Sequence, residues 1–414
     1  MQTLPGFREL YPEDCARRNY LFHAWRAVAR RYGFQEYDGP TLEAAELYEK
    51  KNSGGEILQQ LYQFEDRGGR RVALRPEMTP TLARMAADRE KQSRKPMKWF
   101  SIGPFFRHER QQKGRLREFI QLNCDLLGDS SPGADAETLA LCIDLLRELG
   151  FDSNDIVLRL SDRRAWTEFL KERSIAEERA GDFLAIVDKL EREPEESLRE
   201  KLAEFGITLD DVRAFIASEG NGAFAALLAD LEARGLRDYA RVDLSIVRGL
   251  AYYTGLVFEV FDRAKKFRAV AGGGRYDQLV ASLSEGRSQL PAIGFGMGDV
   301  VLMNLIEATP HALARLQAGT EAAVQIYGIV ADEAQRGPAL GLVQRLREAG
   351  WRVDFGLTPA KVGKQFQAAE ASGATFAVLV GGEWPEVKVK HLPSRTEQLL
   401  PQETLADWLK TAQL

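Results

Sequence analysis

A short basic stretch in the first third of the chain holds the residues best suited to bind a nucleotide. It consists of the run FRHER at residues 106–110, followed by Arg115, Phe119 and Gln121. Arg107 stands at a predicted strand end, where its planar guanidinium can make a forked pair of hydrogen bonds to a phosphate. Phe119 offers a face on which a planar base can stack. Arg107 and Glu109 alternate like residues on one face of a strand, which a solvated hairpin tip does not explain. The stretch therefore predicts a nucleotide cradle.

Two antiparallel strands are predicted to carry this cradle. Residues 97–102 and 105–107 form the first, residues 118–127 form the second, and a charged loop joins them. Five basic residues and one histidine lie within 107–117, although the net charge of the whole chain is −5. Any binding to nucleic acid must therefore use local basic patches and not bulk charge.

The flanking sequence predicts a sheet covered by helices. Before the cradle, apolar spacing predicts a helix over 12–32, a strand over 34–37 that closes at Pro40, a hairpin of strands 57–64 and 70–75, and a helix from Thr79. After it come a helix over 134–150, strands over 156–160, 240–246, 252–261 and 269–271, glycine-rich runs, and a helix from 300 to about 308. This order is typical of an α+β domain with an antiparallel sheet.

Two further segments differ in pattern from this domain. Residues 162–240 are charged and helical, as in an inserted module. From residue 321, strands over 323–330, 351–355, 375–380 and 387–391 alternate with helices over 334–349, 359–372 and 402–412, which predicts an α/β accessory domain with a largely parallel sheet. We therefore expect a catalytic domain in two parts, 1–161 and 241–310, a helical insertion at 162–240 and an accessory domain at 321–414.

Composition narrows the class of protein. The chain has 414 residues, of which 44% are hydrophobic and 28% charged, as in a soluble globular protein of two or three domains. It has no apolar run of membrane-spanning length, and its N-terminus lacks a secretory signal, so we expect a cytoplasmic protein with no membrane partner. The three cysteines and four histidines are too scattered to predict disulfides or a metal site built from protein ligands alone.

Several of these segments, taken in order, resemble one enzyme family. Residues 106–121 look like motif 2 of class II aminoacyl-tRNA synthetases in its histidyl form, and residues 33–40 resemble motif 1, which builds the homodimer interface in that family. LRPEMT at 74–79 is similar to the family's substrate-amine loop, and VRGLAYYTG at 247–255 and AGGGRYD at 271–277 resemble the two histidine signatures. The resemblance implies ATP-dependent activation of L-histidine and its transfer to the 3′ end of tRNA(His).

The resemblance also implies roles at the nucleotide. Attack of a carboxylate on the α-phosphate of ATP spreads negative charge over the phosphate oxygens, so fixed cations matter more than a general base. Arg107 and Arg248 would be the catalytic cations, approaching the α-phosphate from two sides, and Mg²⁺ would be carried by ATP. Arg115 would suit the β- and γ-phosphates, Glu109 the edge of adenine, and Phe119 its face.

Histidine would be recognised at both of its ends, because buried polar groups discriminate against ligands that leave them unpaired. The residues implied for histidine binding are Glu77, Thr79, Gln121, Asp125, Arg248, Tyr252, Tyr253 and Tyr276. Glu77, Thr79 and Gln121 would suit the ammonium and carboxylate groups. Asp125 and Tyr253 would meet the imidazole nitrogens, and Tyr276 would help close the pocket.

The chain departs from the family pattern at four positions. Val301 stands where motif 3 usually has an arginine that packs on ATP. Ala251 replaces the usual aspartate of the first histidine signature, Met78 replaces a glycine, and Asp125 stands where glutamate is common. These differences bear mainly on how ATP is held.

The accessory segment resembles the anticodon-binding domain shared by the histidyl, glycyl, prolyl and threonyl enzymes, most clearly at 363–366 and 374–381. An ordinary flavodoxin-like unit has a similar pattern of helix and buried strand. At the other end of the tRNA, the loop residues Arg110, Gln112 and Lys113 are candidates for contact with the acceptor end. Both ends of a tRNA thus have candidate contacts in the sequence.

Two other functions stay open at this point. A synthetase-like regulatory subunit of the ATP phosphoribosyltransferase of histidine biosynthesis is favoured by the missing motif 3 arginine. It is opposed by the intact motif 2 and by the C-terminal segment, which such subunits usually lack. A tRNA-sensing or assembly role is supported by no fused segment. Exchange of pyrophosphate into ATP that depends on histidine separates the enzyme from both alternatives.

Overall fold

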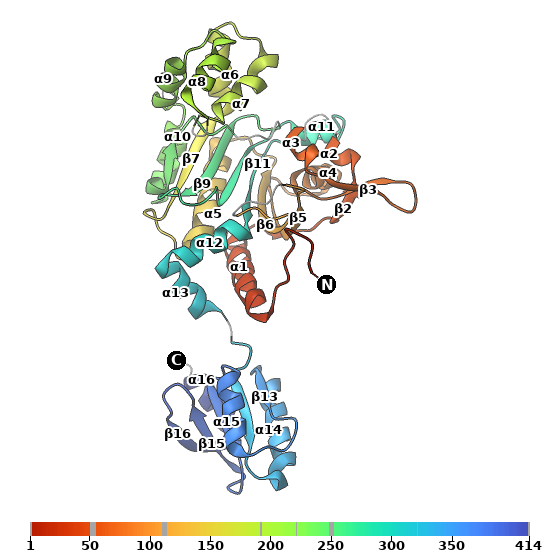
Figure 1. Ribbon diagram of the computed structural model, residues 1–414, viewed down its shortest axis with the longest axis vertical. Coiled ribbons are helices and arrows are strands. Elements are labelled where there is room, and N and C mark those ends of the chain that lie inside the picture. The colour runs from red at the N-terminus through yellow and green to blue at the C-terminus, as the bar shows by residue number, and fades with distance from the viewer. Residues whose placement is uncertain are drawn as a thin grey trace. The chain divides into compact units, whose positions relative to one another are not determined.

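The chain folds into two compact units, Met1–Gly319 and Thr320–Leu414 (Figure 1). The computed structural model describes residues 2–49, 55–109, 114–190, 193–220, 222–247, 252–320 and 322–412. Each unit is described by itself below.

A mixed sheet is the centre of the first unit, with the strand order β1-β5-β6-β11-β10-β9-β7-β8. Its strands are β1 (Gln35–Glu36), β5 (Met97–Phe106), β6 (Glu118–Leu127), β7 (Ile156–Asp162), β8 (Ala240–Val242), β9 (Leu256–Asp262), β10 (Ala271–Arg275) and β11 (Ala292–Gly298). All pairs are antiparallel except β1 with β5 and β7 with β8, the two edge pairs. The predicted antiparallel α+β fold is confirmed. A smaller sheet holds β2 (Leu42–Ala44), β4 (Arg71–Leu74) and β3 (Tyr62–Glu65).

Helices cover one face of the large sheet. The long helix α5 (Pro132–Glu148) packs against β6 and β11, and α1 (Pro12–Arg31) and α10 (Ala225–Ala233) pack against α5 (Figure 1). The other helices of this unit are α2 (Glu46–Glu49), α3 (Gly55–Gln59), α4 (Thr79–Arg89), α6 (Arg163–Glu172), α7 (Ala180–Val187), α8 (Glu195–Ala203), α9 (Leu209–Ala217), α11 (Leu279–Leu283), α12 (Asp299–Ala308) and α13 (Pro310–Gly319). In the described part of the chain, no helix has the length and hydropathy of a transmembrane span.

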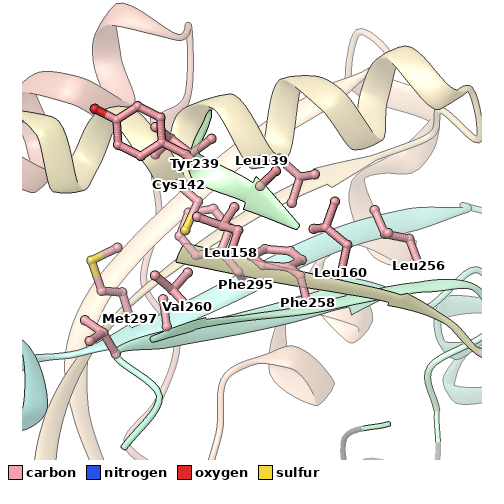
Figure 2. Packing of buried hydrophobic residues seen from close by; sticks show 14 of the residues in the cluster. Leu139, Cys142, Leu158, Leu160, Tyr239, Leu256, Phe258, Val260, Phe295 and Met297 are labelled. Atoms are coloured by element: carbon pink, nitrogen blue, oxygen red, sulfur yellow. The ribbon is translucent and has the colours of Figure 1, made fainter. Parts of the chain in front are cut away.

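The alternation of side chains along the strands decides which face of the sheet is core. Leu122, Cys124 and Leu126 of β6 are buried in the main hydrophobic cluster, beneath α5. Leu139 and Cys142 of α5 lie over Leu158 of β7, Phe258 of β9 and Phe295 of β11 (Figure 2). Because successive residues of a strand point to opposite faces, the intervening residues of β6 face away from this core. The face away from α5, part of which α4 and α11 cover, can therefore form a site.

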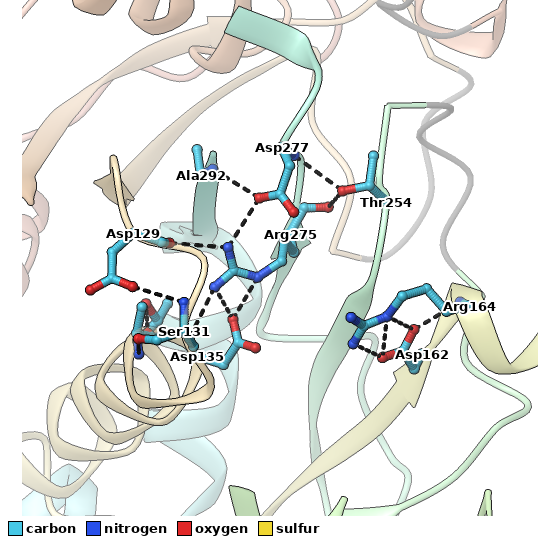
Figure 3. A network of polar contacts seen from close by, with 11 residues as sticks. Asp129, Ser131, Asp135, Asp162, Arg164, Thr254, Arg275, Asp277 and Ala292 are labelled. Atoms are coloured by element: carbon cyan, nitrogen blue, oxygen red, sulfur yellow. Dashed lines mark hydrogen bonds and ion pairs between the residues drawn. The ribbon is translucent and has the colours of Figure 1, made fainter. Parts of the chain in front are cut away.

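A buried arginine ties the end of β10 to the start of α5 (Figure 3). The guanidinium of Arg275, 3% exposed, donates from Nε to Asp135 at 2.9 Å and from Nη1 to Asp277 at 3.0 Å. Asp277 in turn accepts a hydrogen bond from the backbone N–H of Ala292 on β11 at 3.1 Å. A buried charge with this many partners fixes local geometry more than it adds net stability. The arginine and aspartate of the second histidine signature therefore hold the end of β10, directly before Tyr276.

The second unit is a five-stranded sheet with helices. Its order is β13-β12-β14-β15-β16, from β12 (Ile326–Val330), β13 (Val353–Phe355), β14 (Phe376–Val380), β15 (Glu386–His391) and β16 (Glu397–Pro401), with helices α14 (Arg336–Glu348), α15 (Val362–Ala371) and α16 (Leu405–Ala412). β13, β12 and β14 are parallel, whereas β15 and β16 join antiparallel. The predicted sheet is thus only half parallel. β16 was not predicted because four of its five residues are exposed, so that it lacks an alternating pattern.

One predicted strand is partly wrong. The expected strand 57–64 begins only at Tyr62, and α3 occupies the residues before it as far as Gln59. Leu58 and Leu61, three residues apart, both pack against a small cluster around Tyr48. Short apolar runs cannot be assigned to helix or strand by pattern alone, and here the contact with Tyr48 decides in favour of a helical turn.

Candidate active site

A cavity of about 680 Å³ opens on the face of the large sheet that α5 does not cover. Every predicted site residue that the structure describes lines it: Glu77, Thr79, Arg107, Glu109, Arg115, Phe119, Gln121, Asp125, Tyr252, Tyr253 and Tyr276. These residues come from segments up to about two hundred positions apart in the chain. The predicted residues Arg248, Arg110, Gln112 and Lys113, and the departure at Ala251, lie outside the described residues.

Strands β6 and β11 form the floor of the cavity. Phe119, Gln121, Asn123 and Asp125 follow one another at every second position of β6, so they share the face opposite the core. On β11, Gly294 lies directly opposite Asp125 and Gly296 opposite Asn123. A Cβ atom on Gly294 would overlap the carboxylate of Asp125, and one on Gly296 would overlap the amide of Gln121. The motif 3 glycines are therefore needed because they leave room for the β6 side chains.

The deep end of the cavity pairs acids with phenols. Tyr276 donates from its hydroxyl to Asp125 Oδ1 at 2.5 Å, and Tyr252 donates to Glu77 Oε2 at 2.7 Å. Asp125 is 2% exposed and Glu77 4% exposed. The second carboxylate oxygen of Asp125, Oδ2, is buried and accepts no hydrogen bond from the described residues. A ligand with N–H donors would supply what this oxygen lacks, since an unpaired buried acceptor costs about 1–3 kcal/mol.

The buried position of Asp125 changes its acidity. Burial raises its pKa from 3.8 to about 7, the hydrogen bond from Tyr276 opposes this rise, and the nearby carboxylate of Glu77 adds to it. The carboxyl group is thus poised to ionise near neutral pH when a cation or an N–H donor arrives.

This shift predicts a pH effect on stability. Between pH 4 and pH 7 the folded chain holds a proton on Asp125 that the unfolded chain has released, so the stability of the first unit falls as pH rises, by at most about 1.4 kcal/mol per pH unit. Asp125→Asn cannot titrate and should lack this contribution. In urea unfolding, the free energy of unfolding of the wild type should therefore fall relative to that of the variant as the pH rises from 4 to 7. A difference that stays constant from pH 4 to pH 7 would contradict the assignment.

The outer end of the cavity is basic. Arg107 Nε donates to the carbonyl of Pro76 at 3.0 Å, and its guanidinium carbon lies 5.2 Å from the centre of the Phe119 ring. Arg115 is paired with Glu109 at 2.7 Å and is 43% exposed. Arg107 is thus held by one carbonyl acceptor, one aromatic contact and a 4.0 Å ion pair with Glu109, a geometry suited to present the rest of its fork to an anion.

Arg107 and Glu109 reach the cavity by a different route from the one predicted. Strand β5 ends at Phe106, so neither residue is in a strand. The backbone N–H of Arg107 still donates to Arg117 at 2.9 Å, and that of Glu109 turns back to the carbonyl of Arg107 at 2.8 Å. Alternation along a strand therefore does not explain their common direction, and a tight turn after β5 does.

Several other residues that no sequence motif singled out also line the cavity. Asn123 accepts a hydrogen bond from the side-chain amide of Gln121 at 2.9 Å, and the two-residue spacing on β6 was enough to predict it. Val187 at the end of α7 and Leu190 also line the cavity, although both come from the helical segment. Arg268, between β9 and β10, is a further lining residue. No local pattern marks Val187, Leu190 or Arg268, because only the tertiary fold brings them to the cavity.

Comparison with protein families places both units. The family model described as "Histidyl-tRNA synthetase" matches residues 6–299, and the model described as "Anticodon binding domain" matches residues 324–412. The first match spans the strands and helices that build the cavity. The second covers the five-stranded unit.

Several similar proteins are named as histidine–tRNA ligases. A histidine–tRNA ligase of Opitutus terrae is 42% identical, with 97% of this chain and 96% of the relative covered. The chloroplastic/mitochondrial histidine–tRNA ligase of Arabidopsis thaliana is 38% identical, with 94% of this chain and 82% of the relative covered. Among solved structures, a histidyl-tRNA synthetase from Nostoc sp. PCC 7120 has the same fold, with a TM-score of 0.79 at 24% identity over 99% of both chains. The chain belongs to the histidyl-tRNA synthetase family.

Proposed function

We propose that the cavity binds histidine at its deep end and ATP at its outer end, so that the two react in place. The observation that carries this proposal is the union, in one cavity, of the pairs Tyr276–Asp125 and Tyr252–Glu77 with Arg107 and Phe119. Asp125 suits the imidazole N–H, and Glu77 suits the α-ammonium group. Both ligand groups are donors, which is what buried carboxylates require.

The chemistry follows from this placement. A carboxylate oxygen of histidine attacks the α-phosphorus of ATP, the bond to the bridging oxygen of the β-phosphate breaks, and histidyl-adenylate and pyrophosphate form. Negative charge grows on the oxygens around phosphorus, and Arg107 stabilises it without having to reorganise, because Pro76 and Phe119 already hold its side chain. A terminal hydroxyl of tRNA(His) then displaces AMP from the adenylate.

Magnesium would enter with the nucleotide. Mg²⁺ prefers phosphate oxygens and water as ligands and neutralises part of the polyphosphate charge. The outer end of the cavity fits such a magnesium nucleotide, because Arg107 and Arg115 are cations for the phosphate oxygens that the ion leaves uncovered.

The comparisons weigh against a regulatory subunit of ATP phosphoribosyltransferase. The motif 2 residues Arg107, Glu109 and Arg115 meet in the cavity, and an anticodon-binding family model covers 324–412. The ligases of Opitutus terrae and Arabidopsis thaliana align over most of their own length. A solved structure from Bacillus halodurans that carries both descriptions has a TM-score of 0.71 at 24% identity, so its likeness concerns the fold alone. Histidine–tRNA ligase is therefore the function that these observations support.

The test of this function is pyrophosphate exchange. With labelled pyrophosphate, ATP and the purified full chain, label should enter ATP only when histidine is present. Other amino acids, including the near-isostere asparagine and the aromatic tyrosine, serve as controls for the deep end of the cavity. Binding of histidine without any exchange would support the regulatory alternative instead.

A homodimer is part of the proposal. β1 is an edge strand of the large sheet, with Gln35, Glu36 and Asp38 exposed. Arg75, 1% exposed, joins this edge to the cavity: it donates to Asp38 at 3.0 Å and to the carbonyls of Gly39 at 2.9 Å and Pro104 at 2.9 Å. A partner at β1 would thus support the strand that leads to Arg107. Sedimentation should show a dimer at micromolar concentration, and monomer alone would contradict this.

The remaining partners follow from the same family. The second unit would bind the anticodon of tRNA(His), and the loop that holds Arg110, Gln112 and Lys113 would meet the acceptor end. A cytoplasmic location is proposed with them, since the tRNA substrate is there. Cell fractionation with an antibody to the chain would test the location.

A further inference from the structure

The position that motif 3 leaves without a cation lies at the outer end of the cavity. Val301 is in the first turn of α12, directly after the glycines of β11, and lines the cavity. Its side chain is half-buried and packs against the main hydrophobic cluster. No guanidinium can come from this position, so any cation here has to come from another segment.

Arg268 is brought to this position by the loop between β9 and β10. It lines the same cavity as Val301. The two side chains flank Gly114, at the end of the motif 2 loop: a Cβ placed on Gly114 would lie 3.3 Å from Cγ2 of Val301 and 4.0 Å from Cδ of Arg268. Arg268 therefore lies beside the valine, and Arg115, one residue along the chain from Gly114, lines the same cavity.

The loop that carries Arg268 is firmly held. Asp262, 3% exposed, accepts hydrogen bonds from the backbone N–H groups of Lys266 at 2.8 Å and Phe267 at 2.9 Å. The Phe267 side chain packs against the main core, and Val270 N–H donates to the carbonyl of Val260 at 2.8 Å. A cation on a fixed backbone loses less conformational freedom when it binds a ligand than one on a loose loop.

Arg8 also lies near the start of α12, but it makes a structural ion pair there. Its guanidinium is paired at 2.6 Å with Asp299, whose carboxylate also accepts the backbone N–H of Ile120 at 3.0 Å. Arg8 is not among the residues that line the cavity. It anchors α12 to β6, whereas Arg268 lines the cavity beside Val301.

We propose that Arg268 supplies the ATP contact that motif 3 makes from the position of Val301 in other members of the family, by binding the β- and γ-phosphates together with Arg115. This inference rests on the proposed function. The forked guanidinium suits phosphate oxygens, whereas lysine would offer only a point charge. The cation has thus moved from α12 to the β9–β10 loop, and the site keeps its charge.

The test compares binding of a non-hydrolysable ATP analogue with binding of AMP by calorimetry on the full chain. Arg268→Ala should lower the affinity for the analogue about tenfold or more, as expected for the loss of one charged contact. The affinities for AMP and for histidine should stay within about twofold of the wild type. Arg268→Lys should fall between the two. Lys266→Ala is the matched control, because Lys266 is an exposed cation of the same loop that does not line the cavity.

The decisive variant restores the family pattern. In Arg268→Ala combined with Val301→Arg, the new arginine occupies the motif 3 position, and analogue affinity should return to within about threefold of the wild type. An unchanged affinity in Arg268→Ala, a loss equal to that of Lys266→Ala, or a loss that Val301→Arg does not reverse would overturn the proposal. Because binding is measured without catalysis, a wild type that binds the analogue but shows no histidine-dependent exchange would refute the proposed function and not this one.

Discussion

Arg107→Ala should lower the rate of histidine-dependent pyrophosphate exchange by about 10²–10³-fold, the scale seen when one preorganised group facing a developing charge is removed. The loss should appear mainly in kcat, because the charge that Arg107 meets is greatest in the transition state. Arg107→Lys should recover only part of the activity: lysine keeps the charge but cannot donate from Nε to Pro76 while presenting a fork.

Arg67→Ala is a suitable control for this variant, since Arg67 is an exposed arginine near the tip of the β3–β4 hairpin and does not line the cavity. It should leave exchange unchanged. If Arg107→Ala retained more than about a tenth of the wild-type rate with the fold intact, Arg107 would not be the cation at the α-phosphate.

Asp125→Asn should reduce kcat/KM for histidine by about 10²–10³-fold and leave the KM for ATP nearly unchanged. The substitution keeps the shape of the side chain, but it removes the charge and puts an N–H₂ group where an acceptor is needed, so a donor on the ligand would face a donor. Truncating one side of a buried charged pair costs about 2–5 kcal/mol, which sets the scale of the loss.

Two companion variants separate recognition from folding at this position. Tyr276→Phe removes the hydroxyl that donates to Asp125 at 2.5 Å. It should lower kcat/KM for histidine about tenfold, because the carboxylate is retained but less well oriented. Asp88→Asn changes an exposed carboxylate of α4 and should have no effect. An equal loss of kcat/KM for histidine and for ATP in Asp125→Asn would indicate general damage to the site. It would contradict the assignment of Asp125 to the imidazole of histidine.

The residues of β6 show how much of the site the sequence could predict. Phe119, Gln121 and Asp125 were predicted as site residues, and the period of two in a strand also places Asn123 with them. The same period accounts for the buried Leu122 and Cys124 on the other face. Local rules therefore predict both faces of a strand once the strand itself is recognised.

Contacts between distant segments could not be predicted from pattern. The hydrogen bond from Tyr252 to Glu77 joins residues 175 positions apart, and only the order of the strands brings them together. The resemblance to a family placed both residues in one site without explaining why they meet. Arg268 had no such help, because no motif includes it and its neighbour Val301 is a departure from the motif.

The errors also have local physical causes. α3 replaced the start of a predicted strand, and Leu58 in it packs with Leu61 against an apolar cluster at Tyr48. β16 escaped prediction because an edge strand with exposed side chains lacks the alternation that marks a half-buried strand. These two errors lie away from the cavity lining. Strand β11 of the cavity floor was predicted only as a glycine-rich run, because glycine has no side chain that could show the alternation of a strand.

Formation of histidyl-adenylate on the purified chain tests most directly whether the cavity brings histidine and ATP together. With ATP labelled at the α-phosphate, histidine and pyrophosphatase, but without tRNA, the wild type should accumulate labelled adenylate in proportion to its active sites. No adenylate should form without histidine, and in Arg107→Ala it should form about 10²–10³-fold more slowly. Tight binding of both ligands with no labelled adenylate in the wild type would contradict the claim that one cavity brings the histidine carboxylate to the α-phosphate.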